Sequence, residues 1–145
     1  MKLLVLAVSV TIAFAAANAG DDSAKQEMKK LEGTWTLVNG EMDGKAIPAS
    51  DVKTASLVIK GNHHSVHIGR LAIEGTHTVD PAKDPKAIDG LDDSADGKKQ
   101  KRLGIYQVDG ENFEVCFAPP GKVRPTQFNT QPDIGRFRLL WKRVK

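Results

Sequence analysis

Four histidines in the middle of the chain are the residues best suited to chemistry, because imidazole binds metal ions and changes its charge near neutral pH. His63 and His67 lie about 13 Å apart along one strand, too far for both to bind one ion. His64 and His77 fall on one face of adjacent predicted strands, displaced by two positions, so their side chains could meet. Two ligands are fewer than a zinc site needs. We therefore expect no metal centre, and polar histidines in the interior or at the rim of the fold.

An acidic segment, Asp92-Asp93-Ser94-Ala95-Asp96-Gly97, resembles the first half of a calcium loop, because oxygen-bearing side chains alternate before a glycine. Leu103 stands where a calcium loop needs its bidentate glutamate. We therefore expect a solvated loop between two strands rather than a calcium site.

The segment from Ala118 to Thr126 holds three prolines and two cations, Lys122 and Arg124, and is predicted to be a stiff, extended loop. In an exported protein, such a loop could bind a carboxylate or a sugar at the mouth of a barrel. Alternatively, its prolines serve only to keep the segment from pairing with a sheet edge. The sequence leaves both interpretations open.

No catalytic constellation can be recognised. Cys116 lies between Val115 and Phe117 in a predicted strand, where a small apolar filler is its ordinary role and a nucleophile would need a neighbouring base. No serine sits in a nucleophile elbow, and no carboxylate pair is placed at the spacing of a glycosidase. We predict that the protein is not an enzyme.

Residues 1–19 are predicted to be a secretory signal peptide. Lys2 is their only charge, an apolar run follows, and Ala17-Asn18-Ala19 places small residues at both positions that determine cleavage. The apolar run is shorter than the ~20 residues of a membrane-spanning helix. We therefore expect an exported protein, periplasmic or secreted, with no membrane span and with residues 20–145 as one domain.

Composition narrows the range of partners. The chain has 21 Lys and Arg against 18 Asp and Glu, a formal net charge of +3, and the two signs are mixed along it. This excess is too small to indicate nucleic acid or an anionic membrane as a partner. Cys116 is the only cysteine, so no internal disulfide can form and the domain must be stabilised by its core. We expect a monomer without a cofactor.

The elements that must position these residues are one short helix and a series of strands. Asp21 to Leu31 is rich in helix formers and is followed by Gly33. From Gly33 onward, β-branched and aromatic residues alternate between closely spaced turn residues, a pattern typical of an antiparallel sandwich or barrel. Eight strands can be counted. We predict an all-β, eight-stranded, antiparallel up-and-down barrel with a short N-terminal helix.

Two predicted two-residue turns, Gly61-Asn62 and Gly69-Arg70, join three consecutive strands and determine how they pair. They place Lys60 opposite His63 and Ile68 opposite Leu71. The face that results is apolar apart from His64. We therefore assign it to the interior of the barrel.

A later hairpin is predicted to turn through the three-residue loop Val108-Asp109-Gly110. This loop sets Ile105 opposite Phe113 and Leu103 opposite Val115, so that apolar residues match. Cys116 then falls on the outer face.

Gly33-Thr34-Trp35 after a short helix, the eight strands and the terminal Lys142-Arg143 pair together resemble the calycin superfamily, the lipocalins and fatty-acid-binding proteins. The resemblance implies that Trp35 closes the barrel floor and that Arg143 of the last strand packs over it. Such a stack is a structural element worth about 1 kcal/mol.

A second resemblance covers nearly the whole chain after the signal peptide. Its motifs are Lys30–Trp35, Met42–Lys45, Pro85–Asp89, Leu103–Tyr106 and Cys116–Phe128. They are similar to an uncharacterised secreted domain family found in many copies in planctomycete bacteria. That family has no assigned activity, so the resemblance implies a relationship rather than a reaction.

We predict that the protein binds a small apolar or amphipathic molecule in its lumen, without catalysis. The predicted lumen residues are Leu57, Ile59, His64, Val66, Ile68, Leu71, Ile73, His77, Leu103, Ile105, Phe113, Val115 and Phe117. The alternative is a structural or interaction module of the cell envelope, whose barrel is filled by its own side chains and whose loops bind a protein or polysaccharide.

Overall fold

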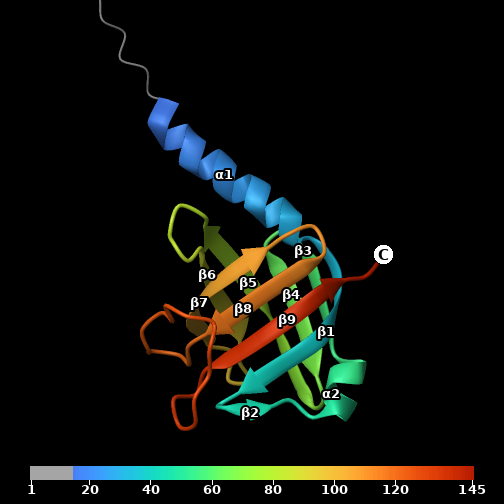
Figure 1. Ribbon diagram of the computed structural model, residues 1–145. Coiled ribbons are helices and arrows are strands. Elements are labelled where there is room, and N and C mark those ends of the chain that lie inside the picture. Colours follow the sequence, from blue (N-terminus) through green and yellow to red (C-terminus); the bar gives the residue numbers. More distant parts are fainter. Residues whose placement is uncertain (1–14) are drawn as a thin grey trace, which may run out of the picture.

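In the part of the chain that the structure describes, nine antiparallel strands follow one long helix (Figure 1). The computed structural model describes residues 15–145. The elements are α1 (Ala15–Leu31), β1 (Gly33–Met42), β2 (Lys45–Ala46), α2 (Ala49–Thr54), β3 (Ser56–Lys60), β4 (His63–Ile68), β5 (Leu71–Asp80), β6 (Ala87–Asp93), β7 (Lys99–Val108), β8 (Asn112–Phe117) and β9 (Phe137–Arg143).

Eight of the strands form a closed barrel, because β1 pairs with both β3 and β9. The pairing of β1 with β9 runs from Trp35 opposite Arg143 to Met42 opposite Phe137. Figure 1 shows these two strands side by side across the front of the barrel. The predicted fold class is confirmed. The short strand β2 and the helix α2 are additions that the sequence analysis did not predict.

The register predicted for β3, β4 and β5 is confirmed. Lys60 pairs with His63 and Ile68 with Leu71, so each hairpin turns through two residues. Gly61 and Gly69 have φ angles of 56° and 58°, in the left-handed region that glycine adopts without steric cost.

The register predicted for β7 and β8 is wrong. Val108, not Ile105, pairs with Phe113, and Ile105 pairs with Cys116. Asp109 explains the longer turn, because its Oδ1 accepts hydrogen bonds from the backbone N–H groups of Glu111 and Asn112. An odd-numbered shift of register turns a strand over.

Leu103 and Ile105 therefore lie on the outer face of β7, not in the lumen as predicted, and Tyr106 lies in the core cluster inside the barrel. The outer position of Ile105 is nevertheless buried. The segment 118–136, which has no regular secondary structure, covers this part of the wall.

The covering segment makes a second, small core outside the barrel. Pro125 and Ala118 are almost fully buried in it, and Cys116 Sγ lies 3.5 Å from the carbonyl oxygen of Asn129. Arg124 Nη1 donates hydrogen bonds to two carbonyl oxygens of the wall, those of Ile88 and Gly104. Ile105 on the outer face of β7 is therefore buried, as Tyr106 is on the inner face.

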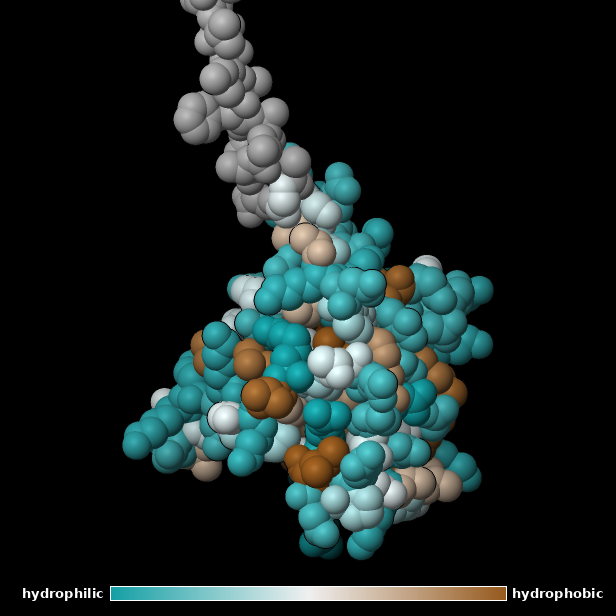
Figure 2. Space-filling view, turned by 60° about the vertical axis from the view of Figure 1, so that its left-hand side comes forward, coloured by the Kyte–Doolittle hydropathy of each residue, from teal (hydrophilic) through white to brown (hydrophobic). Residues whose placement is uncertain are grey.

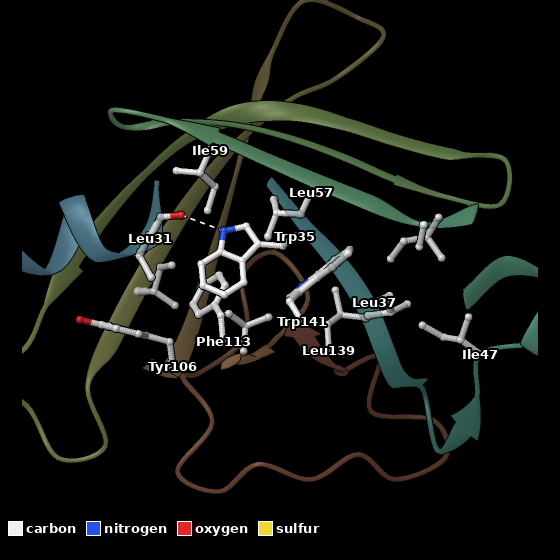
Figure 3. Packing of buried hydrophobic residues seen from close by; sticks show 14 residues of the cluster. Leu31, Trp35, Leu37, Ile47, Leu57, Ile59, Tyr106, Phe113, Leu139 and Trp141 are labelled. Atoms are coloured by element: carbon white, nitrogen blue, oxygen red, sulfur yellow. Dashed lines mark hydrogen bonds between the residues drawn. The ribbon is translucent and has the colours of Figure 1, made fainter. Parts of the chain in front are cut away.

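The end of the barrel near α1 is filled by aromatic side chains (Figure 3). Trp35 has no exposed surface, its Nε1 donates to the carbonyl oxygen of Leu31 at 2.9 Å, and its ring lies 5.6 Å from that of Phe113. The guanidinium of Arg143 lies 4.2 Å from the Trp35 ring centroid. Trp141 is buried in the same cluster. Side chains therefore fill this end of the lumen.

A buried carboxylate attaches α1 to the barrel. Glu27 Oε2 accepts a hydrogen bond of 2.8 Å from the Tyr106 hydroxyl, and Glu27 Oε1 accepts from Lys30 and Lys86. Burial raises the pKa of Glu27, but the hydrogen bonds from Lys30, Tyr106 and Lys86 outweigh it, so that its pKa lies below the ordinary value. The helix thus closes one end of the barrel through both apolar and charged contacts.

The N-terminal predictions are only partly within the described residues. Within the described residues, the helix spans Ala15–Leu31, so it includes residues 15–20 in addition to the predicted Asp21 to Leu31, and it ends at Leu31 as predicted. The first 14 residues of the predicted signal peptide lie outside the described part. Within residues 15–145, no helix is long and apolar enough to cross a membrane.

Candidate functional site

A cavity of about 80 Å³ occupies the half of the lumen that lies away from α1. Its wall is mostly apolar and includes Val66, Ile73 and Phe117 from three different strands. Met42 and Leu71 also line it and are about 41% and 39% exposed, so they lie at its mouth. The cavity is therefore an apolar chamber that is closed at the aromatic end.

One wall of the cavity carries a chain of four polar side chains. His77 Nδ1 lies 3.1 Å from His64 Nδ1, and His64 Nε2 lies 2.8 Å from Asp92 Oδ1. Arg102 Nε donates to Asp92 Oδ2 at 3.1 Å. The guanidinium of Arg102 also lies 5.6 Å from the ring centroid of Phe137. The contact between His64 and His77 that the predicted register allows thus occurs, within a longer chain.

Two glycines allow this chain to cross the strands. Gly75 stands opposite both His64 and Asp92, and Gly90 stands opposite both His77 and Arg102. A Cβ atom at Gly75 would lie 2.4 Å from the carbonyl oxygen of Leu91 and 3.1 Å from Asp92 Oδ1. The His64–Asp92 contact occupies the space that a side chain at position 75 would need.

His77 is the buried end of the chain. The residue is only 3% exposed, and its Nε2 has no hydrogen-bond partner among the described residues. Burial, followed by the charges of His64 and His63, lowers the pKa of His77 to about 4. At neutral pH the ring is therefore uncharged and carries one unsatisfied nitrogen.

We expect Gly75→Ala to destabilise the protein by about 1–3 kcal/mol, because the new methyl group must displace the Leu91 carbonyl or Asp92. Urea unfolding followed by circular dichroism measures the change. Gly110→Ala is the matched control, since nothing lies within 4 Å of the Cβ position at Gly110. Equal stability of the two variants would show that Gly75 is not needed for the crossing.

The remaining predicted lumen residues divide into two groups. The cavity is lined by Ile59, His64, Val66, Ile68, Leu71, Ile73, His77 and Phe117. The packed core holds Leu57, Phe113 and Val115. Leu103 and Ile105, as described above, are outside the barrel.

Sequence reasoning missed several lining residues, namely Met42, Ile88, Gly90, Asp92, Arg102, Phe137 and Leu139. The alternation Ile88, Gly90, Asp92 along β6 was the available signal. Asp92 instead attracted attention as part of a calcium-like loop. In the structure Asp92 bonds His64 and Arg102, whereas Asp93 forms an ion pair with Lys99.

The two cations of the covering segment differ in their surroundings. Arg124 Nη2 lies 2.7 Å from Asp89 Oδ1, and its Nη1 bonds wall carbonyls, so it is not the free loop cation that was predicted. Lys122 is exposed. Only Lys122 is therefore placed to contact a ligand from outside.

Cys116 is fully buried between the barrel wall and the covering segment. Burial raises the pKa of its thiol. Across residues 15–145, no group of three or more His, Cys, Asp or Glu side chains is arranged to hold a metal ion.

Comparison of the chain with protein-family models, with curated proteins and with solved structures finds no match. The site must therefore be interpreted from its own geometry.

Proposed function

We propose that the barrel binds, without transforming it, a small and mostly apolar molecule with one polar group. The observation that carries this proposal is the unpartnered Nε2 of His77, a buried residue at the end of the polar chain on one wall of a mostly apolar cavity. Buried polar atoms in folded proteins are nearly always hydrogen-bonded, so an orphaned nitrogen beside a cavity suits a ligand that supplies the missing partner.

The size of the cavity limits the ligand. A cavity needs about 10–15 Å³ for each water molecule that it holds, so this cavity of about 80 Å³ accommodates roughly half a dozen waters or one small ring. The aromatic cluster around Trp35 and Trp141 fills the rest of the lumen. A single-ring molecule therefore suits the cavity better than a long acyl chain.

The proposal is for binding rather than catalysis. Cys116 is buried and has a raised pKa, and the uncharged His77 is a weak base. An exported location, calycin kinship and kinship with the planctomycete domain family remain part of the proposal. The stacking of Arg143 on Trp35 supports the calycin part.

The alternative is an interaction module that binds a protein or polysaccharide through its surface. Val123, 79% exposed and next to Lys122 on the covering segment, is the observation in its favour. On the face seen in Figure 2, however, hydrophobic residues form small separate patches in a largely hydrophilic surface. Docking surfaces are usually larger and continuous, so the interior is the better candidate.

Titration of the ¹⁵N-labelled protein with phenol tests the proposal. We expect saturable shifts of the backbone amides of Gly75 and Gly90, because Gly90 lines the cavity and Gly75 stands opposite two residues that do, His64 and Asp92. Ile73→Phe places a ring in the cavity and should weaken phenol binding at least tenfold. Val123→Phe makes a comparable change on the exposed covering segment and should leave binding unchanged.

Equal phenol affinity in both variants, or shifts confined to surface amides, would refute lumenal binding. The interaction module would then become the favoured account.

A further inference from the structure

Arg102 and Asp92 balance each other's charge at one end of the polar chain. The guanidinium Nε lies 3.1 Å from Asp92 Oδ2, and both side chains are mostly buried. The charges of Arg102 and Asp92 cancel, so the chain carries no net charge when the His64 ring is neutral.

The ionised carboxylate of Asp92 can only accept hydrogen bonds. Because Asp92 Oδ1 lies 2.8 Å from His64 Nε2, that nitrogen must carry the proton. A neutral imidazole has only one N–H, so His64 Nδ1 carries a lone pair.

This lone pair faces His77 Nδ1 at 3.1 Å. Two bare nitrogens would repel each other at this distance, so His77 Nδ1 must carry its proton and donate it to His64. The other nitrogen of His77, the unpartnered Nε2, is then a bare acceptor. The chain from Asp92 through His64 thus determines the tautomer of His77.

We propose that this chain makes the lumen selective for ligands that donate a hydrogen bond, such as a phenol, an alcohol or an N–H heterocycle. This inference rests on the proposed lumenal binding and specifies its ligand class. A molecule of the same shape that can only accept a hydrogen bond would place its own lone pair against the lone pair of His77 Nε2. Binding of such a molecule is therefore disfavoured.

Nitrogen NMR of the imidazole rings tests the tautomer without any ligand. In the ¹⁵N-labelled protein near neutral pH, we expect His77 to show a protonated Nδ1 and a bare Nε2. We expect His64 to show the opposite pattern. A protonated Nε2 on His77 would overturn the inference whatever the protein binds.

Pyrrole and furan test the selectivity, because they share a five-membered ring but only pyrrole has an N–H donor. We expect pyrrole to bind about fivefold more tightly than furan, the effect of one added hydrogen bond. His64→Phe removes the group that orients His77, so the ratio should fall below about twofold. His67→Phe, a change at an exposed site of the same strand, should retain the wild-type ratio.

The outcomes separate the two proposals. Binding of both rings with equal affinity would refute the selectivity and leave lumenal binding intact. Binding of neither ring, together with no response to phenol, would refute lumenal binding itself. If His64→Phe fails to fold, the tautomer measurement on the wild-type protein still decides the inference.

Discussion

Replacement of Trp35 by alanine is expected to lower the free energy of unfolding by about 3–5 kcal/mol, the range for deleting a buried aromatic side chain. Trp35 has no exposed surface and contacts Phe113, and Arg143 stacks on its ring. Its Nε1 also bonds the carbonyl oxygen of Leu31, the last residue of α1. The variant should therefore lose both the barrel floor and the attachment of the helix.

Unfolding in guanidinium chloride, followed by circular dichroism and by the fluorescence of Trp141, measures this loss of unfolding free energy. Trp35→Phe keeps a ring but no N–H donor, so it should cost less than Trp35→Ala. Val38→Ala, at a half-exposed position of the same strand, should cost less than about 1 kcal/mol. If Trp35→Ala cost no more than Val38→Ala, the aromatic cluster would not be the principal core.

Acidification between pH 6.5 and pH 4 is expected to destabilise the protein through His77. Its pKa is about 4 in the folded state and about 6.5 in the unfolded state. Over this window the unfolded chain binds a proton that the folded protein does not, so stability falls as the pH falls and levels off below about pH 4. The difference in pKa corresponds to roughly 3 kcal/mol.

Carboxyl groups also titrate near pH 4, so the contribution of His77 is obtained by difference. Urea unfolding at several pH values should show a shallower loss for His77→Phe than for the wild type. His67→Phe, at an exposed position, should show the wild-type slope. Parallel curves for the wild type and His77→Phe would contradict the low pKa of the folded state.

The part of the fold that could be predicted from sequence depends on short connections. Turns of two residues leave a hairpin almost no freedom, so Gly61-Asn62 and Gly69-Arg70 predicted the register of β3, β4 and β5 correctly. The same argument brought His64 and His77 to one face. Their contact at 3.1 Å follows from that register.

The prediction failed on β7 because large apolar residues stand on both of its faces. Leu103 and Ile105 match Phe113 and Val115 as well as Tyr106 and Val108 do, so hydrophobic alternation could not choose between them. The choice depends on the turn made by Asp109 and on the covering segment that buries Ile105 from outside. The alternation of apolar and polar residues along one strand reveals neither this turn nor the covering segment.

Asp92 and Arg102 were missed for a related reason. They join the histidine chain only through the pairing of β6 with its two neighbours, across longer connections than the two-residue turns. Gly75 and Gly90, which make room for the chain, lie within the extended strands β5 and β6. Local sequence therefore placed the two histidines on one face but did not reveal their charged partners.

The most direct test of the account is a nuclear Overhauser measurement on the protein saturated with phenol. Lumenal binding predicts contacts from the phenol ring protons to the methyl groups of Val66, Ile73 and Ile88, and to the ring of His77. Contacts restricted to residues of the covering segment, such as Val123, would contradict the account and place the interaction on the surface of the barrel.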